Sequence, residues 1–128
     1  MTNGKNAAGY VLQGWEIHSG SGTRVSEAFV WLKTPDGKSL PHTSAKDVSP
    51  IMALCKAVQK FLPPSSVRIV EQVVLDQGEE PSANMVVMVA GVLGAATVRG
   101  PNILDASVRA FVDAINNAMA AQPVVMVA

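Results

Sequence analysis

The sequence predicts an α+β fold made of two βββα units with pseudo-twofold symmetry, in which two helices pack on antiparallel sheet. Two segments, residues 50–62 and 102–119, have apolar side chains at the 3.6-residue spacing of a helix. Segments of strand character precede each of them. The two halves, about residues 9–64 and 65–122, are close in length, so the order of elements repeats although the residues themselves do not. Together they predict a single domain.

Two predicted strands and a turn begin the first unit. Residues 10–18 alternate between apolar and polar side chains well enough for a strand. Residues 25–33 are rich in β-branched and aromatic residues, which favour a second strand. Residues 34–37, Thr-Pro-Asp-Gly, then predict a tight turn, because proline presets one φ angle and glycine supplies a positive one.

A third strand and the first helix complete this unit. Residues 39–45 predict a weaker strand, and Pro41 confines it to a sheet edge or a strand start because proline has no N–H to donate. Ser49 is a predicted helix N-cap, with Pro50 at the first helical position. The prolines at 63–64 end the helix. The apolar positions of this helix are Ile51, Leu54, Cys55, Val58, Phe61 and Leu62.

The second unit repeats this order. Residues 67–76 predict a strand, and residues 77–83 a polar loop. Residues 84–93 predict a long apolar strand. We expect Gly94 to break this strand, so that residues 95–99 form a short strand of their own before the second helix.

The second helix has the clearest pattern in the chain. Asn102 is a good N-cap, and Asp105, three residues further on, stands where a capping box has its acid. Asp105, Arg109 and Asp113 follow at i, i+4 spacing on the face opposite the apolar stripe, which we expect to face water. The apolar stripe consists of Ile103, Leu104, Val108, Phe111, Val112, Ile115 and Met119.

The strand at 84–93 has apolar side chains on both of its faces, as the run from residue 85 to residue 90 shows. A strand of this kind is buried on both sides. In so small a domain the second face is most simply covered by a partner subunit. We therefore expect a homodimer.

Composition excludes several classes of protein. The chain has 128 residues, of which 48% are hydrophobic and 16% charged, and its formal net charge is zero. Nucleic-acid binding needs a basic patch, and no apolar run is long enough to span a bilayer, so we expect neither partner. A single cysteine excludes an internal disulfide and suits the reducing cytoplasm. Residues 1–8 are interpreted as a disordered leader, and residues 123–128 as an apolar tail without an assigned role.

Few side chains suggest chemistry. His18, His42 and Cys55 are on different predicted elements without the short spacing of metal ligands, so we predict no metal site and no cofactor. Cys55 lies on the apolar stripe of its helix, which indicates a core thiol. The helix starts at Ser49 and Asn102 each present backbone N–H groups that can hold a carboxylate, although every helix start can do so.

The last strand end and helix carry a series of short motifs. They are Gly100-Pro101-Asn102-Ile103, Ala106-Ser107, Ala110-Phe111-Val112 and Asp113-Ala114-Ile115-Asn116. Together they resemble the end of the C-terminal regulatory domain of α-isopropylmalate synthase, a domain that is also found in citramalate synthase. The family often opens its first helix with Gly-x-Gly-Pro; here Pro50 matches, and Asp47 and Ser49 replace the glycines. The resemblance covers roughly residues 10–120.

This resemblance implies an allosteric or dimerisation domain rather than an enzyme. The family domain forms a homodimer, binds leucine or isoleucine near the dimer interface, and so inhibits a catalytic (β/α)₈ barrel. Such a barrel takes about 250 residues, so the resemblance implies a regulatory domain, free-standing or excised, with a catalytic synthase as its partner. Carried over position by position, the family's ligand site falls on Asp47, Ser49, Pro50, Ile51, Asn102 and Ile103.

Departures from the family pattern leave alternatives open. Replacing both glycines adds side chains where the family keeps the backbone open to its ligand. The carboxylate of Asp47 would repel a ligand carboxylate, although it could meet an ammonium group. The alternatives are therefore a branched-chain amino-acid-binding domain, an interaction module of the same fold that has lost its ligand, and a small enzyme that uses Cys55 or a histidine.

Overall fold

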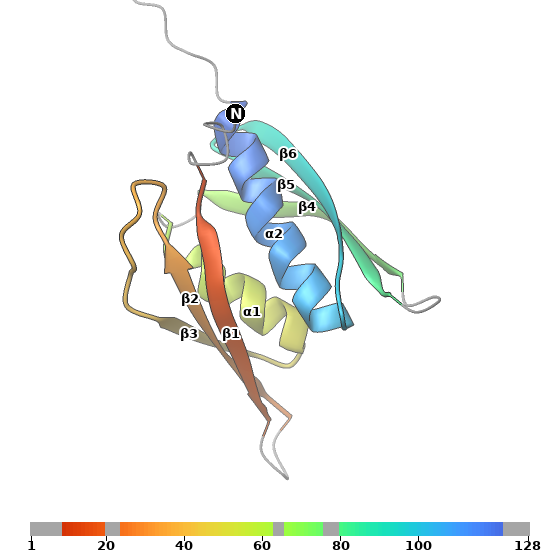
Figure 1. Ribbon diagram of the computed structural model, residues 1–128. Coiled ribbons are helices and arrows are strands. Elements are labelled where there is room, and N and C mark those ends of the chain that lie inside the picture. Colours follow the sequence, from red (N-terminus) through yellow and green to blue (C-terminus); the bar gives the residue numbers. More distant parts are fainter. Residues whose placement is uncertain (1–8, 20–23, 63–65, 76–79, 122–128) are drawn as a thin grey trace, which may run out of the picture.

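The computed structural model describes residues 9–19, 24–62, 66–75 and 80–121, and it confirms the α+β class with two βββα units (Figure 1). The predicted leader and tail lie outside the described residues. The first unit consists of β1 (Val11–Ser19), β2 (Ser26–Lys33), β3 (Thr43–Asp47) and α1 (Pro50–Gln59). The second consists of β4 (Val67–Leu75), β5 (Ser82–Val89), β6 (Val92–Arg99) and α2 (Ile103–Ala120).

The strands form two antiparallel sheets rather than one. The strand order is β1-β2-β3 in the first sheet and β4-β5-β6 in the second. Helix α1 packs on β2 and β3, and helix α2 packs on β5 and β6. The two helices also contact each other, so they lie between the sheets (Figure 1). In this strand order, β1 and β6 are edge strands of their sheets, and both contact α2.

The core lies between each helix and its own sheet. In β2 every second residue is buried, and in β5 the alternate residues from Ala83 to Val89 are buried under α2. Full burial of an aliphatic or aromatic side chain contributes about 1.5–3 kcal/mol. The largest fully buried apolar side chains are Phe111, Leu32, Leu54, Met85, Ile115, Val30, Val58, Val87 and Val108.

The predicted strand break at Gly94 is wrong. Strand β5 ends at Val89, and the turn lies at Ala90 and Gly91, whose φ angles are 50° and 84°. Two positive φ angles in succession are typical of the tight hairpin turn that matches the twist of its strands. Gly94 is buried inside β6, where a Cβ atom would stand 2.3 Å from the carbonyl oxygen of Ala114 in α2. Glycine at this position lets the helix approach the sheet.

Other boundaries shift for local reasons. Strand β3 begins at Thr43, later than predicted, and Ser39 forms only an isolated bridge with Lys33. The strand thus starts after Pro41, which cannot donate to a ladder. Helix α1 ends at Gln59, before the prolines that were expected to stop it, which lie outside the described residues.

Candidate functional site

The candidate residues lie where the two helices begin. Both helices start at the same end of the molecule, at the lower right of Figure 1. The connection from β3 places Asp47 and Ser49 at the start of α1, and the connection from β6 places Asn102 at the start of α2. The fold thus brings six sequence-predicted residues to one end, in two groups that belong to different units.

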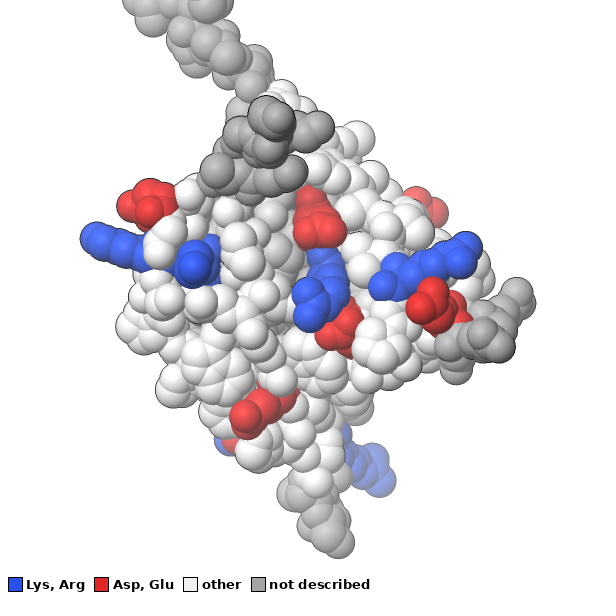
Figure 2. All heavy atoms as spheres, in the orientation of Figure 1, with Lys and Arg blue, Asp and Glu red and all other residues white. Residues whose placement is uncertain are grey.

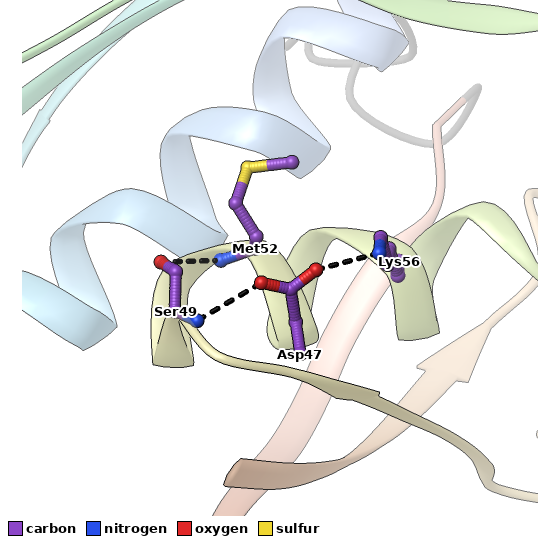
Figure 3. A network of polar contacts seen from close by, with 4 residues as sticks. All are labelled: Asp47, Ser49, Met52 and Lys56. Carbon is purple, nitrogen blue, oxygen red and sulfur yellow. Dashed lines mark hydrogen bonds and ion pairs between the residues drawn. The ribbon is translucent and has the colours of Figure 1, made fainter. Parts of the chain in front are cut away.

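The start of α1 is held by a closed polar network (Figure 3). The Ser49 hydroxyl accepts the Met52 N–H at 3.2 Å, which confirms Ser49 as the N-cap. Asp47 accepts the Ser49 N–H at 2.9 Å with one carboxylate oxygen. Its other oxygen accepts from the Lys56 ammonium at 2.5 Å. Both oxygens of Asp47 are thus engaged within the domain.

This network fixes the charge at the start of α1. The hydrogen bond from Lys56, and then the one from the Ser49 N–H, hold the pKa of the Asp47 carboxyl below its usual value. Asp47 therefore stays ionised and lies at the positive end of the helix dipole, where an anion is favoured. A ligand carboxylate approaching this helix start would meet that negative charge. Sequence reasoning missed Lys56, because its partner lies on the preceding strand.

The start of α2 is capped by Asn102, and its ion pair joins Asp105 in the first turn to Arg109 in the next. The Asn102 side chain accepts the Asp105 N–H at 2.8 Å, which confirms Asn102 as the N-cap. The expectation that Asp105 faces water is wrong, because its side chain is buried. Its carboxylate accepts from Trp15 Nε1 at 3.0 Å and from Arg109 Nε at 2.9 Å. Arg109 itself is exposed, as expected.

Gly100 sets how α2 begins. It is buried, and a Cβ atom there would stand 3.0 Å from Asp105 Oδ2 and 3.1 Å from the Ala106 nitrogen. Its N–H donates to the Pro81 carbonyl at 3.1 Å. The small residue thus lets the first turn of α2 rest against the turn that precedes it. The other three candidate residues, Pro50, Ile51 and Ile103, are apolar and partly buried.

The remaining candidates for chemistry are structural. Cys55 is fully buried, and burial raises the pKa of its thiol to about 12, so it stays protonated and unreactive. His18 and His42 are exposed and flank the ring of Phe29, at centroid distances of 5.1 and 5.9 Å. Within the described residues, no three His, Cys, Asp or Glu side chains come together as a metal site would require.

Comparison of the sequence with models of known protein families gives a match. The family model of the LeuA allosteric (dimerisation) domain matches residues 1–119. The chain belongs to this family. The match spans both βββα units and both helix starts, which confirms the resemblance drawn from the motifs of α2. Comparison with curated proteins gives no match.

Membership of the LeuA dimerisation-domain family identifies a regulatory domain rather than a catalytic one. Its six described strands form two three-stranded antiparallel sheets. Neither helix of the described part is long and apolar enough to cross a membrane.

Proposed function

We propose that this chain is a non-catalytic regulatory domain that forms a homodimer through the outer face of β4–β6 and binds a branched-chain amino acid where its two helices begin. Membership of the LeuA family supports both the regulatory and the dimerisation role. The observation that carries the proposal is the apolar character of the outer sheet face, which no element of the described chain covers.

This outer face is formed by the residues of the second sheet that point away from α2. Val86 and Met88 of β5 lie at its centre, and Leu93, paired with Met88, is 55% exposed. Apolar surface of this kind marks an interaction site. Arg68 and Glu71, opposite Met88 and Val86, give it charges of both signs. A twofold dimer places the same patch on both sides, so the arginine of one subunit can meet the glutamate of the other. The large hydrophobic side chains exposed on β4 and β6 are Val70, Val73, Leu75 and Leu93.

Sedimentation velocity at micromolar concentration tests the dimer. We expect the parent chain to be a dimer and Leu93→Lys to be a monomer, because the lysine ammonium would lose its water in the interface. Val11→Lys is the matched control, since Val11 is 48% exposed on β1 of the other sheet and its substitution should leave the dimer intact. A monomeric parent chain would contradict the proposal, as would a Leu93→Lys variant that dimerises like the parent.

The helix starts offer the groups that a branched-chain amino acid needs. The N–H groups of Ile103 and Leu104 lie in the first turn of α2 and have no partner inside the helix. They can hold a carboxylate, and the helix dipole favours it there. The ammonium group would lie towards Asp47, and an aliphatic side chain would pack on Ile51 and Ile103.

Calorimetric titration with leucine, isoleucine and valine tests this site. We expect heat of binding with at least one of them. Asn102→Asp is the discriminating variant, because aspartate caps a helix as well as asparagine does while its charge repels a ligand carboxylate. It should abolish binding without lowering the unfolding midpoint. Unchanged binding by Asn102→Asp would refute the assignment of the site.

The network at Asp47 favours a second candidate, a dimerisation module that has lost its ligand. The carboxylate of Asp47 accepts the Ser49 N–H at the start of α1, and Lys56 neutralises its charge. A side chain of the domain thus takes the place that a ligand carboxylate would need. In that case the parent chain gives no heat with any of the three amino acids. The double variant Asp47→Gly, Ser49→Gly restores the glycines of the family pattern, and heat from this variant alone would establish the second candidate over the first.

A further inference from the structure

A groove of about 840 Å³ lies over the second half of α2 and has the two edge strands that contact this helix as its walls. One wall is the start of β1, with Val11 and Leu12, and the other is the second half of β6, from Ala96 to Val98. Figure 2 shows this face of the molecule, where acidic and basic side chains alternate down the middle with largely uncharged surface on both sides. None of the six helix-start residues lines the groove.

Two asparagines of α2 show where the open edges of these strands lie. The side-chain amide of Asn116 accepts the Tyr10 N–H at 2.8 Å and donates to the Tyr10 carbonyl at 2.8 Å, as a neighbouring strand would. Asn117 donates to the Ala95 carbonyl of β6 at 2.7 Å. The main-chain groups of Tyr10 and Ala95 thus point away from their own sheets and are bonded by side chains instead.

Further along the groove the same two edges are open. The backbone groups of an antiparallel strand point alternately to its two edges. Those of Leu12 and Thr97, two residues after Tyr10 and Ala95, therefore point to the open edges as well. No strand of the described chain pairs with either edge. An open edge with free N–H and C=O groups is a template for an added strand.

The segment that follows α2 has the residue types of a strand. Residues 122–128, Gln-Pro-Val-Val-Met-Val-Ala, lie outside the described residues and beyond the family match, which ends at residue 119. Pro123 cannot continue a helix. Residues 124–127 are apolar and mostly β-branched, which favours a strand. Since successive side chains of a strand point to opposite faces, both faces of this one would be apolar.

This segment begins at one end of the groove and is long enough to cross it. Ala120, the last residue of α2, lines the groove, and so does Arg109. At about 1.5 Å per residue they lie about 16 Å apart along the helix axis. At about 3.3 Å per residue, the extended residues 124–128 span about the same length. The chain needs only a turn at residues 121–123 to run back along α2.

We propose that residues 124–128 lie in this groove as an added strand beside β1, so that the end of the second unit extends the sheet of the first. Side chains on its inner face would pack on Leu12 and Val112, which line the groove. Those on its outer face would lie beside Val11, which is 48% exposed. The added strand would thus cover apolar surface on both of its faces. This inference goes beyond the proposed function and depends neither on the dimer nor on the helix-start site.

The direction of the added strand follows from two contacts of β1. Tyr10 bonds to Asn116, and Trp15, later in β1, bonds to Asp105, earlier in α2. Strand β1 therefore runs opposite to α2. A segment that turns back after α2 runs in the same direction as β1, so the new pair is parallel.

One polar group on the floor of the groove also favours an added main chain. Asp113 has neither a hydrogen bond nor an ion pair within the described part of the chain. Loss of water raises the pKa of its carboxyl, against the opposing charge of Arg109. A backbone N–H of the added strand that donates to this carboxylate would favour its charged form and offset the lost water.

Amide hydrogen exchange followed by ¹⁵N–¹H NMR tests the added strand. We expect the Leu12 N–H to be protected in the parent chain. Truncation after Gln122 should speed its exchange about tenfold, the change expected when one hydrogen bond is lost. The Thr97 N–H, at the open edge of β6, is the internal control and should exchange equally in both chains. Equal exchange of Leu12 in the two chains would overturn the proposal, as would protection of Thr97 in place of Leu12.

A variant of unchanged length separates the apolar side chains from the chain itself. Replacing residues 124–127 by four serines should speed Leu12 exchange as truncation does, because serine gives little apolar cover. Val48→Ser is the control, since Val48 is 71% exposed and does not line the groove, and it should exchange like the parent. Protected amides inside α2, such as that of Phe111, establish that the variants fold. A serine variant with the parent's protection at Leu12 would overturn the proposal.

A spin label on the last residue locates the segment directly. The chain has one cysteine, Cys55, which is fully buried, so in Ala128→Cys a maleimide nitroxide attaches to residue 128. We expect it to broaden the amide signal of Arg109 more than that of Ala120. The reverse order would overturn the proposal. In a mixture of labelled ¹⁴N chains with unlabelled ¹⁵N chains, broadening at Arg109 would place the segment in the partner's groove, and this would overturn docking within one chain.

Discussion

Gly94 is expected to be the least replaceable glycine of the described chain, and Gly94→Ala tests how closely α2 is seated on its sheet. A Cβ at this position would stand 2.3 Å from the Ala114 carbonyl oxygen and 2.4 Å from the Ala118 nitrogen. Both atoms belong to the helix backbone, so no side-chain rotation relieves the contact. The helix must move away from β6 by about 1 Å, since interiors are close-packed and do not absorb such overlap.

The cost of that movement can be estimated. Overpacking a core costs about 1–3 kcal/mol, and a backbone obstacle places Gly94→Ala at the upper end. Alanine also lowers the conformational entropy of the unfolded chain, which stabilises the folded state by about 0.4–1 kcal/mol. We expect a net loss of about 2 kcal/mol in the free energy of unfolding, which for a chain of this size lowers the melting temperature by roughly 5–10 °C.

Urea denaturation followed by circular dichroism measures this loss, at one protomer concentration because a dimer's stability depends on it. Gly91→Ala is the matched control. Gly91 has a φ of 84°, and a methyl group there would meet nothing within 4 Å, so its substitution costs only backbone strain, about 1 kcal/mol. We therefore expect Gly94→Ala to lose more stability than Gly91→Ala. A Gly94→Ala variant as stable as the parent would refute the close approach of α2.

Three further predictions concern single groups. Asn116→Ala removes both hydrogen bonds to Tyr10 and should cost about 2 kcal/mol, with faster hydrogen exchange of the Tyr10 amide; unchanged exchange would contradict the tether. Ser107 has a fully buried hydroxyl without a partner in the described chain, so Ser107→Ala should raise stability by about 1 kcal/mol in urea titrations, whereas a loss would indicate a partner. Asp47 has a lowered pKa, so the parent should be more stable than Asp47→Asn at pH 7. This difference in the free energy of unfolding should vanish as the pH falls through the folded-state pKa of Asp47, below 3.8. A difference that is constant with pH would exclude the Lys56 pair as its source.

The features that the sequence could predict are those set by neighbours in the chain. Ser49 and Asn102 cap their helices through hydrogen bonds to residues three positions ahead, and such bonds follow from local residue types. The apolar periodicity of α2 likewise identifies its buried face, because that face follows from helix geometry alone. The two βββα units follow from the same local signals.

The features that the sequence could not predict depend on packing between distant segments. The residues around Gly94 look the same whether this glycine ends a strand or lets a helix pack closely on one. Only the positions of Ala114 and Ala118 in α2 show that it does the second. Asp105 has the spacing of a capping-box acid, yet its carboxylate accepts a hydrogen bond from Trp15, which is 90 positions away in sequence. No pattern in the sequence connects these two residues.

The difference between the two helices follows from how their charges are used. At the start of α1, Asp47 and Lys56 neutralise each other, so a ligand must displace an existing pair in order to bind there. On α2, the buried Asp105 already holds Arg109 in place, while Asp113 has neither a hydrogen bond nor an ion pair in the described chain. An ion pair that must be broken costs affinity, whereas a fixed donor beside an unpartnered acceptor costs little to engage. On these grounds a ligand carboxylate should bind the start of α2, whose first N–H groups have no partner inside the helix, more readily than the start of α1, and calorimetric titration of Asn102→Asp beside Asp47→Asn measures that difference.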